Sequence, residues 1–214
     1  MNFPVCKISH RVCVLILVLF SQFIVNAAVA DSSKNGIQQA LIQTTMGGIT
    51  IELYADKAPI TVANFIAYIK DSAFNGGEFY RVVGPDNDQG TPQISVIQGR
   101  ASQTHTDFPP ISLETTRRTK IKHLDGTLSM ARGGPDSATQ EFFICVGPQP
   151  ALDFSGLRNP DGQGFAAFGR VIAGMDIVKA IQQNRQTKAV DEAYVENQIL
   201  AQPVKILSIS LIAN

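Results

Sequence analysis

The sequence contains no tryptophan and only three cysteines among its 214 residues. Cys6 and Cys13 lie in an N-terminal segment that we expect to be removed, which leaves Cys145 alone. A single thiol cannot form an internal disulfide, so disulfide-stabilised folds are excluded. Because Cys145 belongs to the apolar run Phe-Phe-Ile-Cys-Val, we interpret it as a small buried hydrophobic residue rather than as a reactive nucleophile.

The sequence also lacks an excess of either charge, with 18 basic and 18 acidic residues. Loss of Lys7 and Arg11 with the N-terminal segment would leave 18 − 2 = 16 basic residues against 18 acidic ones. Such a balance provides no basic surface for nucleic acid or an anionic membrane, so we expect neither as a partner. We interpret the densest basic run, residues 117–122, as an exposed loop.

Motifs for metals, nucleotides and nucleophilic catalysis are absent. His105 lies in a polar loop and His123 precedes an apolar run, and neither has the Cys, His or Asp neighbours that a metal site requires. There is no glycine-rich nucleotide loop and no G-x-S-x-G motif. We therefore expect no metal and no cofactor, and we interpret both histidines as solvated or hydrogen-bonded residues.

Residues 1–30 have the composition of a secretory signal peptide. Lys7 and Arg11 mark a basic start, an apolar run of 14 residues follows at Val12–Val25, and the small-residue motif Ala-Val-Ala ends at Ala30. The run is shorter than the roughly 18 residues of a membrane-spanning helix, which disfavours the alternative of a permanent anchor. We predict cleavage after Ala30 and no stable membrane insertion of the mature chain.

The remaining 214 − 30 = 184 residues suit one domain with a sizeable core. Residues 31–38 are polar and predict a flexible leader before a domain spanning residues 39–214. Apolar residues recur at helical spacing in Pro59–Tyr68 and in Gly174–Gln183, which predicts two helices. Short apolar runs bounded by turn residues predict eight strands: Ala40–Thr44, Ile49–Leu53, Phe79–Val83, Ile94–Gln98, Thr127–Arg132, Phe142–Val146, Phe165–Ile172 and Pro203–Ile212.

The predicted strands do not alternate regularly with helices, so a parallel α/β sheet is not expected. An antiparallel barrel of eight strands has no sheet edges and fills its interior with side chains. We predict a mainly β fold, a closed eight-stranded antiparallel barrel capped by two helices, with any binding site on the outside of the wall. The long polar loops 84–93 and 153–164 are predicted insertions.

Residues 126–146 combine two apolar runs with a loop rich in glycine, proline, serine and threonine. Backbone polar groups in such a loop need water, so the loop lies at the surface. Strand alternation points Phe142 and Phe143 to opposite faces, one of them into the core. The other, beside the glycine-rich loop, predicts a small apolar pocket.

Five segments share their order and spacing with one known family. They are FYRVV (Phe79–Val83), VIQG (Val96–Gly99), GTLSMAR (Gly126–Arg132), EFFICV (Glu141–Val146) and FAAFGRVIAGMDIV (Phe165–Val178). Together they resemble the cyclophilins, peptidyl-prolyl cis/trans isomerases built on a closed eight-stranded barrel. The resemblance extends from about Ala40 to Ile212.

The resemblance implies roles for individual residues. Arg81 occupies the position of the catalytic arginine, whose N–H groups would donate to the prolyl nitrogen as the amide twists. Gln98 is similar to the glutamine that holds the substrate backbone, and Phe143 to the phenylalanine on the floor of the proline pocket. The other implied substrate contacts are Val96, Ala131, Arg132, Glu141, Leu152 and Phe165.

Several positions depart from the family pattern. A Ser-Val pair at 95–96 replaces a bulkier Phe-Met pair, Ala151 stands at the position of a pocket tryptophan, and Phe165 stands where many members have histidine. These changes imply weak binding of cyclosporin-like cyclic peptides. Arg132 and Glu141 replace asparagine and glutamine, and we hypothesise that they pair across the groove.

The resemblance and the signal peptide together predict a monomeric periplasmic isomerase. Its partners would be unfolded or extended polypeptides containing X–Pro bonds, and its use would be to assist the folding of exported proteins. The alternative is a low-turnover binding module or chaperone on the same barrel, which the altered positions 95–96 and 151 favour and Arg81 disfavours. A carrier for small apolar ligands is disfavoured because side chains fill such a barrel.

Overall fold

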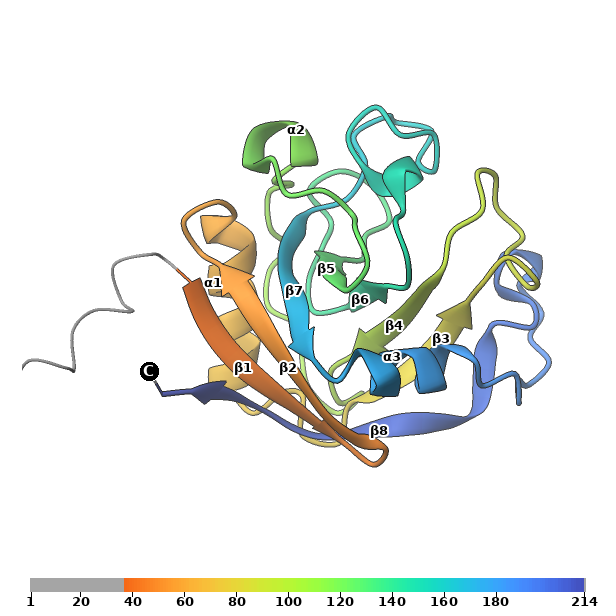
Figure 1. Cartoon of the computed structure of the whole chain (residues 1–214), viewed down its shortest axis with the longest axis horizontal. Coiled ribbons are helices and arrows are strands. Elements are labelled where there is room, and N and C mark those ends of the chain that lie inside the picture. The colour runs from red at the N-terminus through yellow and green to blue at the C-terminus, as the bar shows by residue number, and fades with distance from the viewer. Residues whose placement is uncertain (1–36, 214) are drawn as a thin grey trace, which may run out of the picture. The chain divides into compact units, whose positions relative to one another are not determined.

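The computed structural model describes residues 37–213, so the predicted signal peptide and residues 31–36 of the predicted leader lie outside the described residues. The strands are β1 (Ile37–Thr44), β2 (Gly47–Tyr54), β3 (Glu78–Val83), β4 (Val96–Arg100), β5 (Thr127–Met130), β6 (Phe142–Cys145), β7 (Ala167–Ala173) and β8 (Ile199–Ile212). They close into a barrel in the order β1-β2-β7-β5-β6-β4-β3-β8, and every pair is antiparallel (Figure 1). The predicted fold is confirmed.

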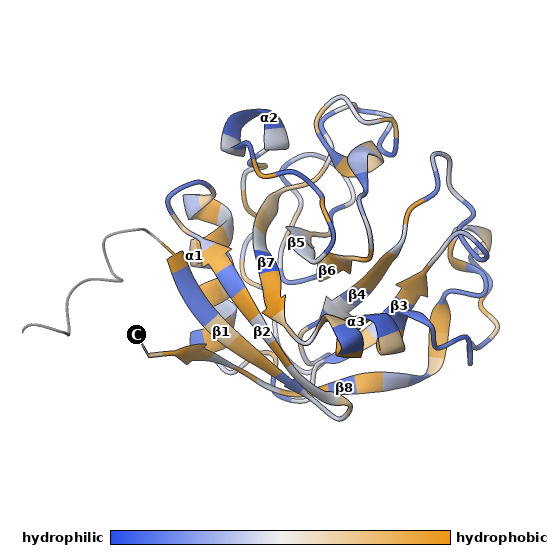
Figure 2. Cartoon of the chain, in the orientation of Figure 1, coloured by the Kyte–Doolittle hydropathy of each residue, from blue (hydrophilic) through white to orange (hydrophobic). Residues whose placement is uncertain are grey.

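The barrel interior is filled by the inward-facing residues of alternating strands. Apolar and polar residues alternate along β1 and β2 (Figure 2), and Ile42, Ile49 and Ile51 are fully buried. Phe142 from β6 lies at the centre of an aromatic cluster, with its ring centroid within 5.7 Å of three other phenylalanine rings, those of Phe65, Phe74 and Phe79. The interior is therefore a packed core and not a ligand cavity.

Two helices add apolar residues to this core, as predicted. They are α1 (Pro59–Lys70) and α3 (Met175–Gln182), and Figure 1 shows them on opposite sides of the barrel. Proline is favoured at the first turn of α1 because a proline there forgoes no intrahelical hydrogen bond. The shorter elements are the one-turn helix α2 (Thr116–Thr119) and the 3-10 turns η2 (Pro150–Leu152) and η3 (Ala193–Val195). No helix within residues 37–213 has the length and apolar character needed to cross a membrane.

The bounds of all eight strands differ from the prediction by one to four residues at one end or both, and two of these differences have identifiable reasons. β1 begins at Ile37, inside the predicted leader, because Ile37 and Gln38 pair with the end of β2. β4 begins at Val96 rather than at Ile94, since the backbone N–H of Ile94 donates to the Asp88 carboxylate at 2.7 Å instead of to a neighbouring strand. Side-chain acceptors thus replace strand pairing where the loop 84–93 meets the barrel.

Candidate active site

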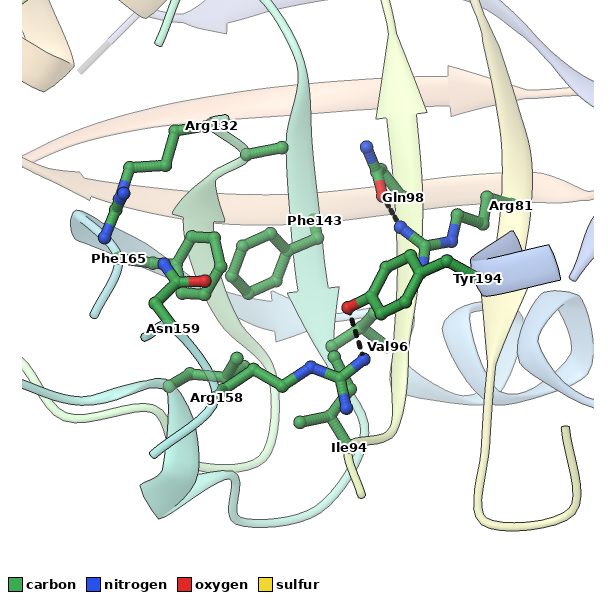
Figure 3. Close-up of a pocket in the computed structure, with 12 residues that line it drawn as sticks. Arg81, Ile94, Val96, Gln98, Arg132, Phe143, Arg158, Asn159, Phe165 and Tyr194 are labelled. Atoms are coloured by element: carbon green, nitrogen blue, oxygen red, sulfur yellow. Dashed lines mark hydrogen bonds between the residues drawn. The ribbon is translucent and has the colours of Figure 1, made fainter. Parts of the chain in front are cut away.

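Three predicted catalytic residues lie side by side on neighbouring strands. Arg81 in β3 is paired in register with Gln98 in β4, and Gln98 is paired with Phe143 in β6. Residues opposite one another in adjacent antiparallel strands project from the same face of a sheet. The strand pairing therefore brings a guanidinium, an amide and a phenyl ring together on one face of the wall (Figure 3).

A β-bulge in β3 determines which face Arg81 occupies. The register of β3 against β4 shifts between Phe79 and Arg81, and its register against β8 shifts at the same point. Phe79 is fully buried in the barrel core, and uninterrupted alternation would turn Arg81 to the same side. The extra residue, Tyr80, changes this, so Tyr80 and Arg81 both project outward.

These side chains border a cavity of about 270 Å³ on the outer side of the barrel wall. Eight of the nine predicted site residues line it: Arg81, Val96, Gln98, Ala131, Arg132, Phe143, Leu152 and Phe165. Phe143 belongs to a small apolar cluster that is separate from the barrel core, whereas Phe142 belongs to the core. The predicted division between one inward and one outward phenylalanine is confirmed.

The apolar cluster beneath the cavity also contains Cys145, which is fully buried. Burial raises the pKa of its thiol, so the thiolate that a nucleophile requires does not form near neutral pH. Its interpretation as a small buried hydrophobic residue is confirmed. Above it, the rings of Phe143 and Phe165 stand edge to face, with centroids 5.4 Å apart and an interplanar angle of 90°.

Amide oxygens, and not a carboxylate, hold the guanidinium of Arg81. Its Nε and Nη2 donate to Oε1 of Gln198 at 2.8 and 2.6 Å, and its Nη1 donates to Oε1 of Gln98 at 3.1 Å. Within residues 37–213, five other arginines form salt bridges with carboxylates, whereas Arg81 forms none. A guanidinium has five N–H groups, so 5 − 3 = 2 remain for a molecule in the cavity.

A hydrogen-bond network fixes the orientation of Gln98. Its Nε2 donates to the Tyr80 hydroxyl at 2.9 Å and to Oε2 of Glu141 at 2.7 Å, and the Tyr80 hydroxyl donates to the same Oε2 at 2.8 Å. Burial, together with the nearby Glu141 charge, raises the pKa of Tyr80 and keeps its hydroxyl protonated. Glu141, which we predicted as a substrate contact, is not among the residues that line the cavity, and it orients Gln98 through this hydrogen bond.

Arg132 pairs with Asp161, so the predicted pair between Arg132 and Glu141 is wrong. Its Nη1 and Nη2 lie 2.8 and 2.9 Å from the two carboxylate oxygens of Asp161, and its Nε donates to the carbonyl of Gly164 at 2.8 Å. Both partners belong to the loop 153–164. This loop supplies Arg132 with a carboxylate, while Glu141 is engaged elsewhere.

A buried chain of hydrogen bonds supports the floor of the cavity. The imidazole of His123 stacks on the ring of Phe143, with centroids 6.0 Å apart and an interplanar angle of 16°. Because an ionised carboxylate only accepts, His123 Nδ1 donates to Oδ1 of Asp153 at 2.9 Å, and its Nε2 accepts from the Ser129 hydroxyl at 3.0 Å. Ser129 is fully buried, so this arrangement presents no nucleophile and serves to hold Phe143.

We expect His123 to make the free energy of unfolding depend on pH. Burial disfavours the imidazolium and lowers the pKa of His123, against the opposing hydrogen bond and charge of Asp153. The unfolded pKa is about 6.5, so between about pH 6.5 and the lower folded value the unfolded chain binds more protons. Stability is therefore fully present above about pH 6.5 and decreases as the pH falls, by at most about 1.4 kcal/mol per pH unit.

Urea unfolding of the wild type and of His123→Gln, between about pH 7.5 and about pH 5.5, measures this effect. The variant should show a shallower dependence because it has no group at this site that titrates in that range. In the wild type, hydrogen bonds from His123 outweigh the burial of Asp153 and lower its pKa, so Asp153 titrates below this window. In the variant, the amide N–H of the glutamine and the backbone N–H of residue 123 can still donate to Asp153. Equal pH dependence in the two proteins would contradict the prediction.

Four residues that line the cavity were not identified from the sequence: Ile94, Arg158, Asn159 and Tyr194. Arg158 and Asn159 belong to the loop 153–164, which we predicted as an insertion without assigning it a role, and Tyr194 belongs to η3. Irregular loops carry no periodic pattern that indicates where they fold. The departure at Ala151 indicated that the cavity wall differs from the family pattern, but it did not indicate which segment forms the wall.

Comparisons with known proteins agree with this geometry. The family model described as "Cyclophilin type peptidyl-prolyl cis-trans isomerase/CLD" matches residues 40–211. The peptidyl-prolyl cis-trans isomerase of Acinetobacter baylyi is 37% identical over 175 residues, which are 79% of this chain and 83% of that protein. Peptidyl-prolyl cis-trans isomerase A of Dickeya dadantii is 32% identical and covers 82% of this chain and 85% of its own length.

Among solved structures, a cyclophilin-type peptidyl-prolyl cis-trans isomerase of Cryptosporidium parvum superposes with a TM-score of 0.59. The superposition covers 83% of this chain and 99% of that one at 19% sequence identity, and so shows a shared fold. The family model and the relatives match nearly the whole described barrel. This chain therefore belongs to the cyclophilin-type peptidyl-prolyl cis/trans isomerases.

Proposed function

We propose that this isomerase acts on X–Pro bonds of proteins that fold outside the cytoplasm, with Arg81, Gln98 and Phe143 as its catalytic residues. One observation carries the assignment of residues. The charged guanidinium of Arg81, which has no carboxylate partner within residues 37–213 and keeps two N–H groups free, projects beside an apolar floor on the same face of the barrel.

Isomerisation breaks no covalent bond, and its barrier of about 18–20 kcal/mol arises from amide resonance. The prolyl nitrogen gains lone-pair density only when the amide twists. A donor directed at that nitrogen therefore binds the transition state better than the ground state, which is the requirement for catalysis. Arg81 supplies this donor, and the apolar surface of Phe143 and Leu152 holds the proline ring against it.

Gln98 positions Arg81 and contributes one further acceptor. Both N–H groups of its amide are donated to Tyr80 and Glu141, and its Oε1 accepts from Arg81. A carbonyl oxygen has two lone pairs, so Oε1 retains one for a backbone N–H of the substrate. An extended substrate would lie along Ala131 and Arg132, whose charge Asp161 already balances.

The proposed location and oligomeric state rest on other features. The basic, apolar and small-residue regions of residues 1–30 support export to the periplasm. The closed barrel supports a monomer, because its eight strands leave no edge for pairing with a second copy. Light scattering during gel filtration measures the oligomeric state, and a stable dimer would contradict the proposed monomer.

We expect the mature protein to begin at Asp31 and to accelerate the slow refolding phase of an exported, proline-limited client. That phase takes about 10–100 s without a catalyst, so a catalyst at micromolar concentration should shorten it measurably. N-terminal sequencing of protein from the periplasmic fraction tests the cleavage site. Retention of Met1 in a cytoplasmic fraction would overturn the location while leaving the chemistry of the pocket unaffected.

A further inference from the structure

An aromatic side chain from an irregular loop forms part of the cavity wall. Tyr194, in η3 between α3 and β8, is 46% exposed and lines the cavity beside Arg81. The centroid of its ring lies 5.5 Å from the guanidinium carbon of Arg81 and 5.6 Å from that of Arg158. Figure 3 shows the ring between the two guanidinium groups.

A buried ion pair anchors Tyr194 in this position. Nη2 of Arg158 donates to the Tyr194 hydroxyl at 2.8 Å. Arg158 also forms a bidentate pair with Asp88, with both N–O distances 2.8 Å and side-chain exposures of 3% and 0%. The anchor thus joins the loops 84–93 and 153–164 to the connection that carries Tyr194.

The charge of Arg158 is balanced by Asp88, and four of its five N–H groups are used within the protein. Both oxygens of Asp88 accept from its guanidinium, and its Nη1 also donates to the carbonyl of Pro92 at 2.8 Å. Burial opposes ionisation of Asp88, but the hydrogen bonds from Arg158 outweigh it and lower the pKa of this carboxyl. Arg158 therefore acts as an anchor for Tyr194 and does not serve as a second donor to the substrate.

The same connection also holds Arg81. Gln198 follows Tyr194 by four residues, is fully buried, and accepts from Nε and Nη2 of Arg81. Its own Nε2 donates to the carbonyl of Asn87 at 2.8 Å. Because Gln198 holds Arg81 without Tyr194, the tyrosine ring is not needed to position Arg81 and can contact the substrate.

We infer that Tyr194 is a specificity-determining residue, which contacts the substrate side chain next to proline on the side away from Ala131 and Arg132. The inference rests on the proposed function and adds a subsite to it. In Figure 3, Phe143 lies between Arg132 and Tyr194. When the substrate proline rests on Phe143 and the chain on one side of it lies along Ala131 and Arg132, the residue on the other side of the proline contacts the ring of Tyr194.

The chemistry of this wall selects the side chain that it contacts. A phenol ring anchored through its hydroxyl presents an apolar, electron-rich face, which favours aromatic and aliphatic side chains. Tyr194 supplies such a face beside Arg81, from a connection outside the strands.

Two peptide series test the assignment, one varying the residue before proline and one the residue after it, each with Gly, Leu, Phe and Glu. Tyr194→Ala should lower kcat/KM about fivefold to tenfold for Phe and Leu at one of the two positions. The glycine peptides should change less than twofold. Tyr194→Phe keeps the ring but loses the hydroxyl that Arg158 anchors, so it should retain part of the preference. The control is Tyr54→Ala, because Tyr54 also contacts a cation but does not line the cavity. This variant should leave kcat/KM unchanged for every peptide of both series.

Equal loss across all peptides, or no loss at any position, would overturn the specificity assignment. Wild-type turnover of the glycine peptides reports the proposed function by itself, so the two failures are distinguishable. NMR titration of the same peptides gives their relative affinities without turnover. The ratio between the Phe and Gly peptides should fall about fivefold in Tyr194→Ala, and an unchanged ratio would overturn the inference.

Discussion

Arg81→Ala is expected to lower kcat/KM for cis-to-trans isomerisation of a short X–Pro peptide by about 10²–10³-fold, the range found when one preorganised donor to a transition state is removed. The variant keeps the apolar pocket, so peptide binding should weaken far less than turnover. A protease-coupled assay gives the rate, and NMR titration gives the affinity. The comparison separates catalysis from binding.

Matched arginine variants make this prediction specific. Arg81→Lys retains the positive charge but not the planar fork that satisfies Gln98 and Gln198, so it should recover only part of the lost rate. Arg170→Ala removes an exposed arginine on β7 that pairs with Glu52 on β2, and it should leave the rate unchanged. Wild type that binds the peptide without accelerating its isomerisation would instead support the binding-module alternative.

Phe142→Ala is expected to lower the free energy of unfolding by about 3–5 kcal/mol, while its neighbour Phe143→Ala should mainly lower activity. Phe142 is fully buried among three other phenylalanine rings, and its loss leaves a cavity in a packed core. Phe143 belongs to the smaller apolar cluster outside the barrel core and borders the cavity, so its loss removes fewer packing contacts and disrupts no barrel interior.

Phe143→Ala should lower kcat/KM by about tenfold or more, because the proline ring loses the apolar surface on which it rests. Urea unfolding and the peptide assay, applied to both variants, give two independent numbers for each residue. If the Phe142→Ala variant remains folded, it should keep most of the wild-type activity. Equal losses of stability in the two variants would contradict the division between core and pocket.

The alternation of apolar residues was sufficient to predict which strands exist and that one phenylalanine faces inward. The prediction succeeded because a half-buried strand must place alternate residues in different surroundings, as Phe142 and Phe143 do. The positions of both main helices followed from the 3.6-residue period in the same way. Family resemblance then identified the row formed by Arg81, Gln98 and Phe143.

Local alternation alone could not predict the outward direction of Arg81. A uniform strand would place Phe79 and Arg81 on one face, and the shift at Tyr80 depends on how two other strands pair with β3. A bulge is a property of paired strands and leaves no clear mark in five residues of sequence. Here the resemblance succeeded where the periodicity would have failed.

Charged partners were the least predictable part of the site. Arg132 had an acidic candidate in Glu141, but Asp161, in an irregular loop, is the residue that pairs with it. The pair between Asp88 and Arg158 joins residues 70 positions apart, and neither residue belongs to a regular strand or helix. Such contacts depend on the path of the loops, which composition alone does not determine.

The pairing of β1 with β8 has a consequence for synthesis of the chain. The barrel closes through a strand that ends at Ile212, and this last strand pairs with both β1 and β3. A nascent chain without it exposes two unpaired edges at once, which favours aggregation, and pairing between sequence-distant strands is slow. The barrel therefore cannot close before the C-terminal strand has been made, and loss of that strand by truncation opens the wall on both sides.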